Sequence, residues 1–167
     1  SIALRIDNDW HYRQRSTNAT YRWNNINFNA NYGGIPKNVF LHVTDKLYQT
    51  LPLYSNLKTT GVYVYATDFD IPQAAATIHV ESEVKNEYDT PKTFQYSVAV
   101  FDLDNKKVAE FSGDETKLAP GELTKVSAAQ RLGDLNFWSW GYGYLYTVKS
   151  MLKVEGNVID EVSTKTG

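Results

Sequence analysis

The sequence contains no cysteine among its 167 residues. A disulfide, a cysteine-ligated zinc ion and a thiol nucleophile are therefore all excluded by composition. The same absence leaves the cellular compartment open, because a chain without thiols is compatible with both reducing and oxidising surroundings.

Long apolar runs and an excess of one charge are missing too. Lys and Arg total 17 against 19 Asp and Glu, so the formal net charge is -2. No stretch approaches the roughly 20 apolar residues of a membrane-spanning helix, and no charged-then-apolar leader opens the chain. We therefore expect neither a nucleic-acid partner nor a membrane partner.

Histidine is scarce, and its spacing does not suit a metal. His11, His42 and His79 are the only three, and strand alternation makes His42 and His79 solvent-facing. Carboxylate pairs, which glycoside hydrolysis needs, lie on polar faces or at strand ends, where we expect solvated groups. These pairs are Asp7 and Asp9, Asp68 and Asp70, Glu81 and Glu83, and Asp102 and Asp104. The sequence predicts no metal site, no cofactor and no catalytic residue.

The chain does have apolar and polar residues that alternate with a period of two, which predicts β-strands. Residues 62 to 163 hold about seven such segments separated by turns, the number expected of an immunoglobulin-like sandwich. No helix of ordinary length is visible. We predict an all-β fold, an immunoglobulin-like β-sandwich of about seven strands without the antibody-type disulfide.

Two parts of this pattern are informative. Ile78, Val80 and Val84 share one strand face, with Ser82 as a polar interruption, and the opposite face is polar and predicted to be wet. Alternation over residues 144–154 predicts a strand that Glu155-Gly156-Asn157 turns back into a C-terminal hairpin. Residues 127–132 are predicted to be at most a turn or a frayed strand.

The first 44 residues follow another pattern. Ile2, Leu4 and Ile6 suggest one strand and residues 39–43 another, separated by some thirty residues rich in Asn, Arg and aromatics. So long a loop is uncommon inside a domain, and two strands cannot bury a core of their own. We therefore expect residues 1–44 to be the end of a preceding domain, cut by the start of the sequence, and residues 45–167 to be the sandwich domain.

Two aromatic segments are candidates for a site. The segment from Trp138 to Tyr146 holds two of the four tryptophans, and such rings serve either a core or a sugar-binding surface. The segment from Trp23 to Tyr32 interleaves rings with asparagines, whose amides could hydrogen-bond a sugar beside a stacked ring. Asparagine also collects in irregular loops because it populates turns, so both interpretations of this loop remain open.

Four segments of the chain occur in an order that we can compare with a known family: Ile2 to Asn8, Gly33 to Leu41, Leu135 to Tyr146, and Asp160 to Gly167. They resemble the L-A-V-R-V-D-N strand, the G-G-I-x-R-x-V-x-L segment, the L-W-S-P-x-x-P-x-L-Y segment and the stretch before F-G-F-R in glycoside hydrolase family 2, the β-galactosidase and β-glucuronidase family. Lys37 stands where Arg is usual, and Trp140-Gly141-Tyr142-Gly143 replaces P-x-x-P. These departures suggest a distinct bacterial subgroup, and the sequence as a whole is most similar to β-galactosidase-like proteins of gut Bacteroides.

The resemblance implies a role without catalysis. The family's two catalytic glutamates lie in a (β/α)8 barrel that would begin after Gly167, so this chain alone should be inactive. Its partners would be that barrel and the sugar-binding jelly roll of the same parent, of which residues 1–44 would be the end. The family sends a loop of the jelly roll toward the substrate, which makes Asn25, Asn27 and Asn29 candidate contacts to a galactoside-type sugar. Export of the parent and a cytoplasmic location both stay open.

Two other functions fit the sequence: an autonomous carbohydrate-binding module, and a fibronectin-like interaction domain. The former predicts exposed, roughly coplanar rings. The resemblance at residues 138–146 instead predicts that Trp138 and at least one of Tyr144 and Tyr146 are mostly buried, and that Tyr142 is exposed.

Overall fold

The computed structural model describes residues 3–4, 18, 34–35 and 37–167. The chain divides into two compact units, Ser1–Val43 and Thr44–Gly167. The identity of the first unit as the end of a jelly roll stays a prediction. The second unit carries the fold described below.

The second unit is all-β. The part of the chain that the structure describes contains eight strands and no helix, hence none long and apolar enough to cross a membrane. The strands are β1 (Leu47–Gln49), β2 (Val62–Asp70), β3 (Ala75–Asn86), β4 (Lys92–Phe101), β5 (Lys107–Leu118), β6 (Leu123–Leu132), β7 (Tyr146–Val154) and β8 (Asn157–Thr166).

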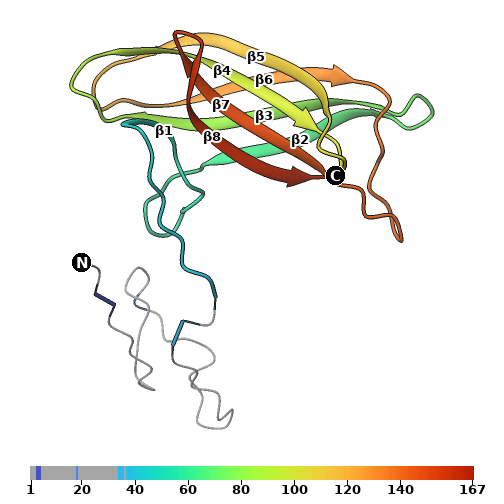
Figure 1. The fold of residues 1–167 in the computed structure, drawn as a ribbon, viewed down its shortest axis with the longest axis horizontal. Helices are drawn as coiled ribbons and strands as arrows, with labels where there is room; N and C mark the ends of the chain where they lie inside the picture. The colour runs from blue at the N-terminus through green and yellow to red at the C-terminus, as the bar shows by residue number, and fades with distance from the viewer. Residues whose placement is uncertain (1–2, 5–17, 19–33, 36) are drawn as a thin grey trace. The chain divides into compact units, whose positions relative to one another are not determined.

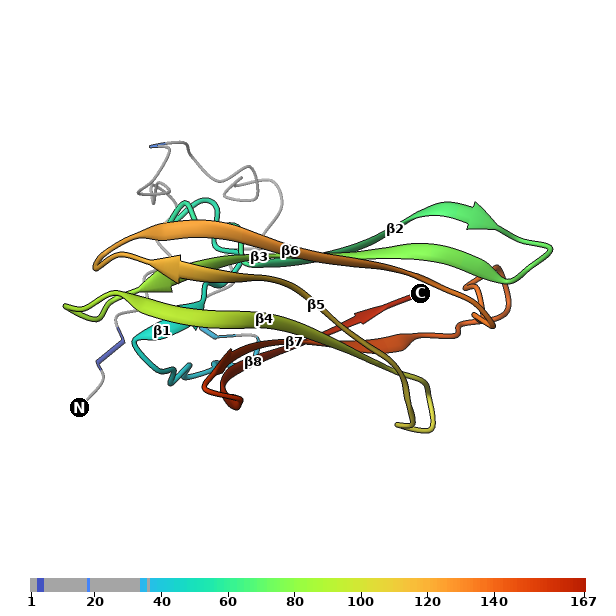
Figure 2. The ribbon, with the colours of Figure 1, turned by 90° about the horizontal axis from the view of Figure 1, so that it is seen from above.

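The strands form two antiparallel sheets that stack as a sandwich (Figures 1 and 2). In the first sheet β3 is central, with β6 along one edge and β1 and β2 sharing the other. The second sheet has the order β5-β4-β7-β8. The predicted immunoglobulin-like sandwich is thus confirmed, and β2 to β8 account for the predicted strands over residues 62 to 163.

The core lies between the two sheets and follows from the alternation. Val80 and Val84 of β3 are completely buried, and they meet Phe94 and Val98 of β4 and Val148 of β7 in one cluster. Alternate side chains of each strand point inward. The predicted C-terminal hairpin is confirmed, with Glu155 and Gly156 at its tip.

Two strands are not predicted correctly from the local sequence. Residues 127–132, predicted to be a turn or a frayed strand, belong to β6, which pairs with β3 from Leu123 to Leu132. The prediction was wrong because pairing along the whole of β3 compensates for the weak strand preference of Ser127-Ala128-Ala129-Gln130. The three-residue β1 was not predicted, since it too is defined by its pairing with β3.

Residues 37–43 form no strand in the structure, although alternation predicts one around Val39, Leu41 and Val43. Their side chains are exposed, to 69%, 79% and 85% respectively. A strand needs a partner for its backbone hydrogen bonds. Among the described residues, residues 37–43 have no partner strand.

The two sheets are also joined by a polar cluster inside the sandwich. Gln49 of β1 accepts hydrogen bonds from the Ser82 hydroxyl of β3 (3.1 Å) and the Ser150 hydroxyl of β7 (2.7 Å) through Oε1. Its Nε2 donates to Oδ2 of Asp160 on β8 (3.1 Å). Gln49, Ser82 and Ser150 are all buried, so one amide connects strands of both sheets.

Candidate functional site

The asparagines proposed from the sequence, Asn25, Asn27 and Asn29, lie outside the described residues, as do His11, Asp7 and Asp9. The candidate that the structure does describe is the aromatic segment between β6 and β7. We call residues 133–145 the aromatic loop.

A tight turn shapes the tip of the aromatic loop. The backbone N–H groups of Ser139 and Tyr142 each donate to the other residue's carbonyl oxygen, at 3.0 and 2.9 Å. Trp140 and Gly141 therefore occupy the turn, and Gly141 has a φ of 77°, a conformation that glycine adopts readily. The Trp140 side chain is 97% exposed.

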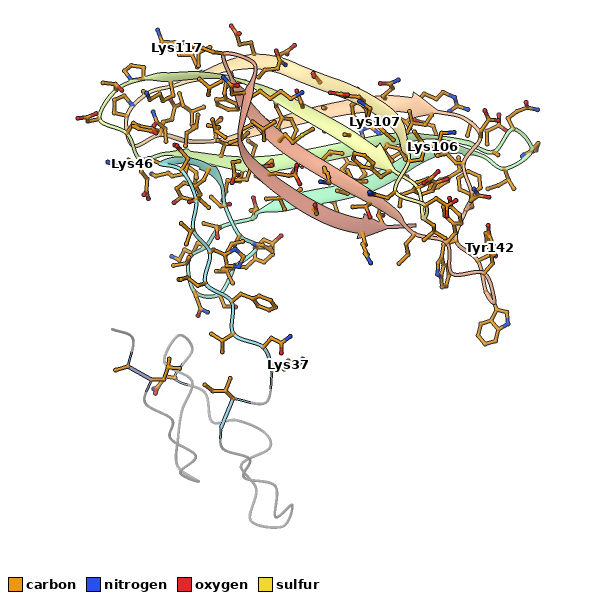
Figure 3. The ribbon with its side chains drawn as sticks, viewed as in Figure 1. Lys37, Lys46, Lys106, Lys107, Lys117 and Tyr142 are labelled. Atoms are coloured by element: carbon orange, nitrogen blue, oxygen red, sulfur yellow. The ribbon has the colours of Figure 1, made fainter. Side chains whose placement is uncertain are left out.

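The two rings beside the tip are exposed as well, Trp138 to 57% and Tyr142 to 48%. Figure 3 shows Tyr142 projecting from the loop. The predicted burial of Trp138 was wrong, because the loop turns away from the sandwich and the strand begins only at Tyr146. The predictions for the tyrosines are confirmed, since Tyr146 is buried and Tyr142 is exposed.

Tyrosine rings connect the tip of the loop to the core. The centroids of Tyr142 and Tyr144 are 5.9 Å apart, and those of Tyr144 and Tyr146 are 5.1 Å apart. Asn136 forms hydrogen bonds with the first and the last of these three tyrosines. Its backbone N–H donates to the Tyr146 hydroxyl (2.8 Å), and its Oδ1 accepts from the Tyr142 hydroxyl (3.3 Å). The Leu135 N–H donates to the carbonyl oxygen of Ala74 (2.8 Å). These contacts join the aromatic loop to Tyr146 at the start of β7 and to Ala74.

Behind the aromatic loop the sandwich contains a cavity of about 220 Å³, which we call the end cavity. Its lining is mostly apolar, and no Asp, Glu, His, Lys or Arg side chain contributes to it. The residues that line it include Phe69, Ile78, Leu132, Leu135, Phe137 and Gly167. Such a lining can bind an apolar group but cannot supply the carboxyl pair of a glycosidase.

Gly167 lies against the aromatic loop as well as the end cavity. A Cβ atom on this residue would overlap the carbonyl oxygen of Tyr144 and would lie 3.2 Å from Cβ of Trp138. The backbone just after β8 therefore passes close to the aromatic loop.

The carboxylates and histidines of the described residues are dispersed. No group of three or more metal-ligating side chains comes together in that part of the chain. The predicted solvation of Glu83 was wrong: it is buried and accepts hydrogen bonds from the Thr50 hydroxyl (2.8 Å) and the Thr60 N–H (3.0 Å). It organises the loop after β1. His79 stacks on Tyr65, with centroids 4.8 Å apart, and shares a hydrogen bond with Thr67 (2.8 Å).

Three carboxyl groups, those of Glu110, Asp68 and Asp45, have a lowered pKa. Hydrogen bonds from Lys107 and Lys153 lower the pKa of Glu110, and the Thr67 hydroxyl lowers the pKa of Asp68. The backbone N–H of Leu47 does the same for the pKa of Asp45. A glycosidase acid requires a raised pKa, and none of these groups has one.

The family model described as "Glycosyl hydrolases family 2" matches residues 61–167. The chain belongs to this family. The matched residues include seven of the eight strands, β2 to β8, and the whole aromatic loop.

Named relatives cover the same segment. A protein of Formosa agariphila named Beta-glucuronidase is 36% identical over 99% of this chain and 16% of its own. A solved β-glucuronidase from glycoside hydrolase family 2 has a TM-score of 0.70 at 33% identity, over 74% of this chain and 13% of its own. A solved family 2 member from Bacteroides cellulosilyticus has a TM-score of 0.62 at 25% identity, over 74% and 16%. The chain thus matches only a small part of each relative.

Proposed function

We propose that this chain is the non-catalytic sandwich portion of a larger family 2 glycoside hydrolase, in which it fixes the sugar-binding domain relative to the catalytic barrel. The observation that carries the proposal is a family 2 match over the sandwich that spans only 16% of the Formosa relative, together with an end cavity that no Asp or Glu side chain lines. Rigid placement matters because an error of about 1 Å in positioning can cost on the order of a hundredfold in rate.

The first unit has a proposed role as the end of the sugar-binding jelly roll. The exposed apolar side chains of Val39, Phe40, Leu41 and Val43 support this assignment, since such a run suits a strand whose partners belong to another part of the parent. Asn25, Asn27 and Asn29 remain the candidate sugar contacts of this unit.

The parent is proposed to hydrolyse terminal β-glycosides, with β-galactosides and β-glucuronides as the two substrates to compare. The sequence resemblance favours galactosides, whereas the name of the Formosa relative favours glucuronides. The ratio of kcat/KM for the two nitrophenyl sugars, measured on the full-length parent, distinguishes them.

The positional role is tested with three proteins: the chain alone, the full-length parent, and the parent with residues 47–166 replaced by a flexible Gly-Ser linker. We expect no turnover from the chain, turnover from the parent, and a loss of about a hundredfold or more in the linker protein. Sustained turnover by the chain alone, or a linker protein as active as the parent, contradicts the proposal.

A carbohydrate-binding module is the second candidate, favoured by the exposure of Trp140, Trp138 and Tyr142. It predicts that galactose, glucuronic acid or their oligosaccharides quench the tryptophan fluorescence of the chain with Trp10→Phe and Trp23→Phe, in which only Trp138 and Trp140 remain. A flat titration at millimolar sugar eliminates this candidate.

A further inference from the structure

We infer that β8 is an interaction edge, which pairs in antiparallel orientation with β8 of a second copy of this chain, centred on Ser163. The pairing joins the four-stranded second sheets of the two copies into one continuous sheet. The inference goes beyond the proposed function and does not depend on it, because it concerns the association of the chain with itself.

One side of β8 is free for a new strand. β8 is the last strand of the second sheet, and among the described strands it pairs with β7 alone (Figures 1 and 2). It is ten residues long, contains neither glycine nor proline, and pairs with β7 without interruption from Asp160 to Thr166. The unpaired backbone groups of a long, regular edge are a template for another strand.

The other edge strands are protected against such pairing. β1 has only three residues. β2 carries a bulge between Thr67 and Asp70, where Asp68 adopts a φ of 51°, and bulges turn an edge away from a partner. β5 and β6 lie so close that a Cβ atom on Gly113 would overlap the carbonyl oxygen of Ser127. Among the described residues, the regular part of β8 has neither kind of protection.

The charges on β8 select the register of the pair. Glu161, Ser163 and Lys165 alternate along the strand, so their side chains share one face, and all three are exposed. In a two-fold antiparallel pair one residue lies opposite itself. With Ser163 in that position, Glu161 of each copy lies opposite Lys165 of the other. Centring the pair on Glu161 or on Lys165 instead sets like charges against each other, which is unfavourable.

The ion pairs of the single chain fit this register. Lys165 forms no ion pair with a described residue, whereas Glu161 accepts a hydrogen bond from Lys149 (2.8 Å). A carboxylate can accept several hydrogen bonds, so Glu161 can also accept one from Lys165 of the second copy. Lysine on an edge strand usually prevents pairing, but β8 supplies the opposite charge at the matching position. Charge complementarity therefore favours a second copy as the occupant.

The contact is closed and requires no rearrangement of the interior. Each copy has one β8, so a two-fold pair satisfies both edges and recruits no third copy. Asp160, at the start of the paired segment, points inward, where its carboxylate accepts hydrogen bonds from the backbone N–H (2.9 Å) and Nε2 (3.1 Å) of Gln49. A single strand pair is a small interface, so we expect a dimer whose fraction depends on concentration.

Sedimentation velocity of the 167-residue chain over a concentration series tests the inference. We expect a monomer at low concentration and a dimer at high concentration. Lys165→Glu sets two glutamates against each other at both symmetric positions and should raise the dimer Kd by about tenfold or more. Lys117→Glu makes the same change in net charge on β5, at the opposite edge of the sheet (Figure 3), and should leave the Kd within about twofold.

A double variant tests the register. Glu161→Lys combined with Lys165→Glu exchanges the two charges, so each lysine again lies opposite a glutamate across the two-fold axis. This variant should recover most of the affinity that Lys165→Glu loses, which a merely structural role of Lys165 does not explain. Circular dichroism checks that each variant is folded. A folded double variant that recovers no affinity contradicts the register.

The absence of cysteine from the sequence allows a direct test of the geometry. Ser163→Cys places the two thiols across the two-fold axis at a Cα separation of about 4.5–5.5 Å, which a disulfide can bridge. Under mild oxidation we expect it to form a covalent dimer at least about tenfold faster than Ser112→Cys, because pairing raises the effective concentration of the thiols. Ser112 is an exposed serine of β5 and is the matched control.

Three further results overturn the inference: a chain that stays monomeric up to its solubility limit, a dimer whose Kd is unchanged by Lys165→Glu, or Ser163→Cys that oxidises no faster than Ser112→Cys. The glycosidase assays above report on the proposed function separately, so a failure of β8 pairing leaves that proposal untouched.

Discussion

At the scale of single residues, Tyr96 stands apart from the rest of the core. Its hydroxyl is the buried side-chain polar group, within the described part of the chain, that lacks a hydrogen-bond partner. The neighbouring Ser82 and Ser150 hydroxyls both donate to Gln49 instead. Burial is the main cause that raises the pKa of Tyr96 above its usual 10.0.

Replacing Tyr96 by Phe removes a hydroxyl that forms no bond, so we expect the free energy of unfolding at pH 7 to change by less than about 1 kcal/mol. Above pH 10 the unfolded chain ionises at this residue while the folded protein keeps it neutral, so stability falls as pH rises. Tyr96→Phe should reduce that alkaline loss. Urea titrations at pH 7 and pH 10.5 measure both effects.

A loss of 2 kcal/mol or more at pH 7 would contradict this expectation and would indicate a buried water bound to the hydroxyl. Tyr63→Phe, on an exposed residue, is the control for the loss of a hydroxyl at pH 7.

The residue scale is also where sequence reasoning failed most. Alternation places Glu83 on the polar face of β3, but it cannot show that the segment after β1 folds back over that face and buries the carboxylate. Trp138 was assigned to the core by its place in a motif, whereas a turn of two residues carries it outward. The Glu83 error concerns contacts with residues distant in the sequence, and the Trp138 error concerns a neighbouring turn that the motif does not show.

At the scale of elements, β5 of the second sheet contacts β6 of the first. The register of β4 and β5 shifts between Gln95 and Ser97, and a bulge containing Gly113 bends β5 at that point. A Cβ atom on Gly113 would overlap the carbonyl oxygen of Ser127 on β6. The missing side chain of Gly113 thus permits the approach.

Gly113→Ala should therefore destabilise the protein by about 1–3 kcal/mol, the range for overpacking a tight contact. Gly133→Ala is the matched control, because nothing lies within 4 Å of the added atom, and it should change stability by less than about 0.5 kcal/mol. Thermal unfolding followed by circular dichroism compares the two. Equal midpoints for the two variants would show that β5 and β6 can separate at no cost.

Most elements could be predicted from the sequence because their alternation reflects burial on one side of a sheet. Val80 and Val84 of β3 and Val148 and Leu152 of β7 are buried as their spacing requires. β1 and the second half of β6 could not be predicted, since both are strands because they pair with β3. Of the candidate site, the aromatic loop was visible in the sequence, but the end cavity behind it arises only when both sheets are assembled.

At the scale of the whole molecule, the buried hydrophobic residues that the structure describes all belong to the unit Thr44–Gly167. A unit with its own core can fold independently. The sandwich should therefore need nothing from residues 1–43.

A protein comprising residues 44–167 should unfold in one cooperative transition, with a midpoint within about 5 °C of the sandwich transition in the entire chain, a shift equivalent to about 1 kcal/mol. Differential scanning calorimetry on both proteins measures this. A truncated protein without a cooperative transition would show that the first unit is required for folding.

The link through Gln49 bears on where such a protein can be made. A disulfide between sheets forms only under oxidising conditions, whereas the bonds from Gln49 to Ser82, Ser150 and Asp160 form as the sandwich closes. The sandwich consequently needs no oxidant and no disulfide isomerase to mature, and glutathione or dithiothreitol leaves its covalent structure unchanged. The sandwich can therefore reach the same folded state under reducing and under oxidising conditions.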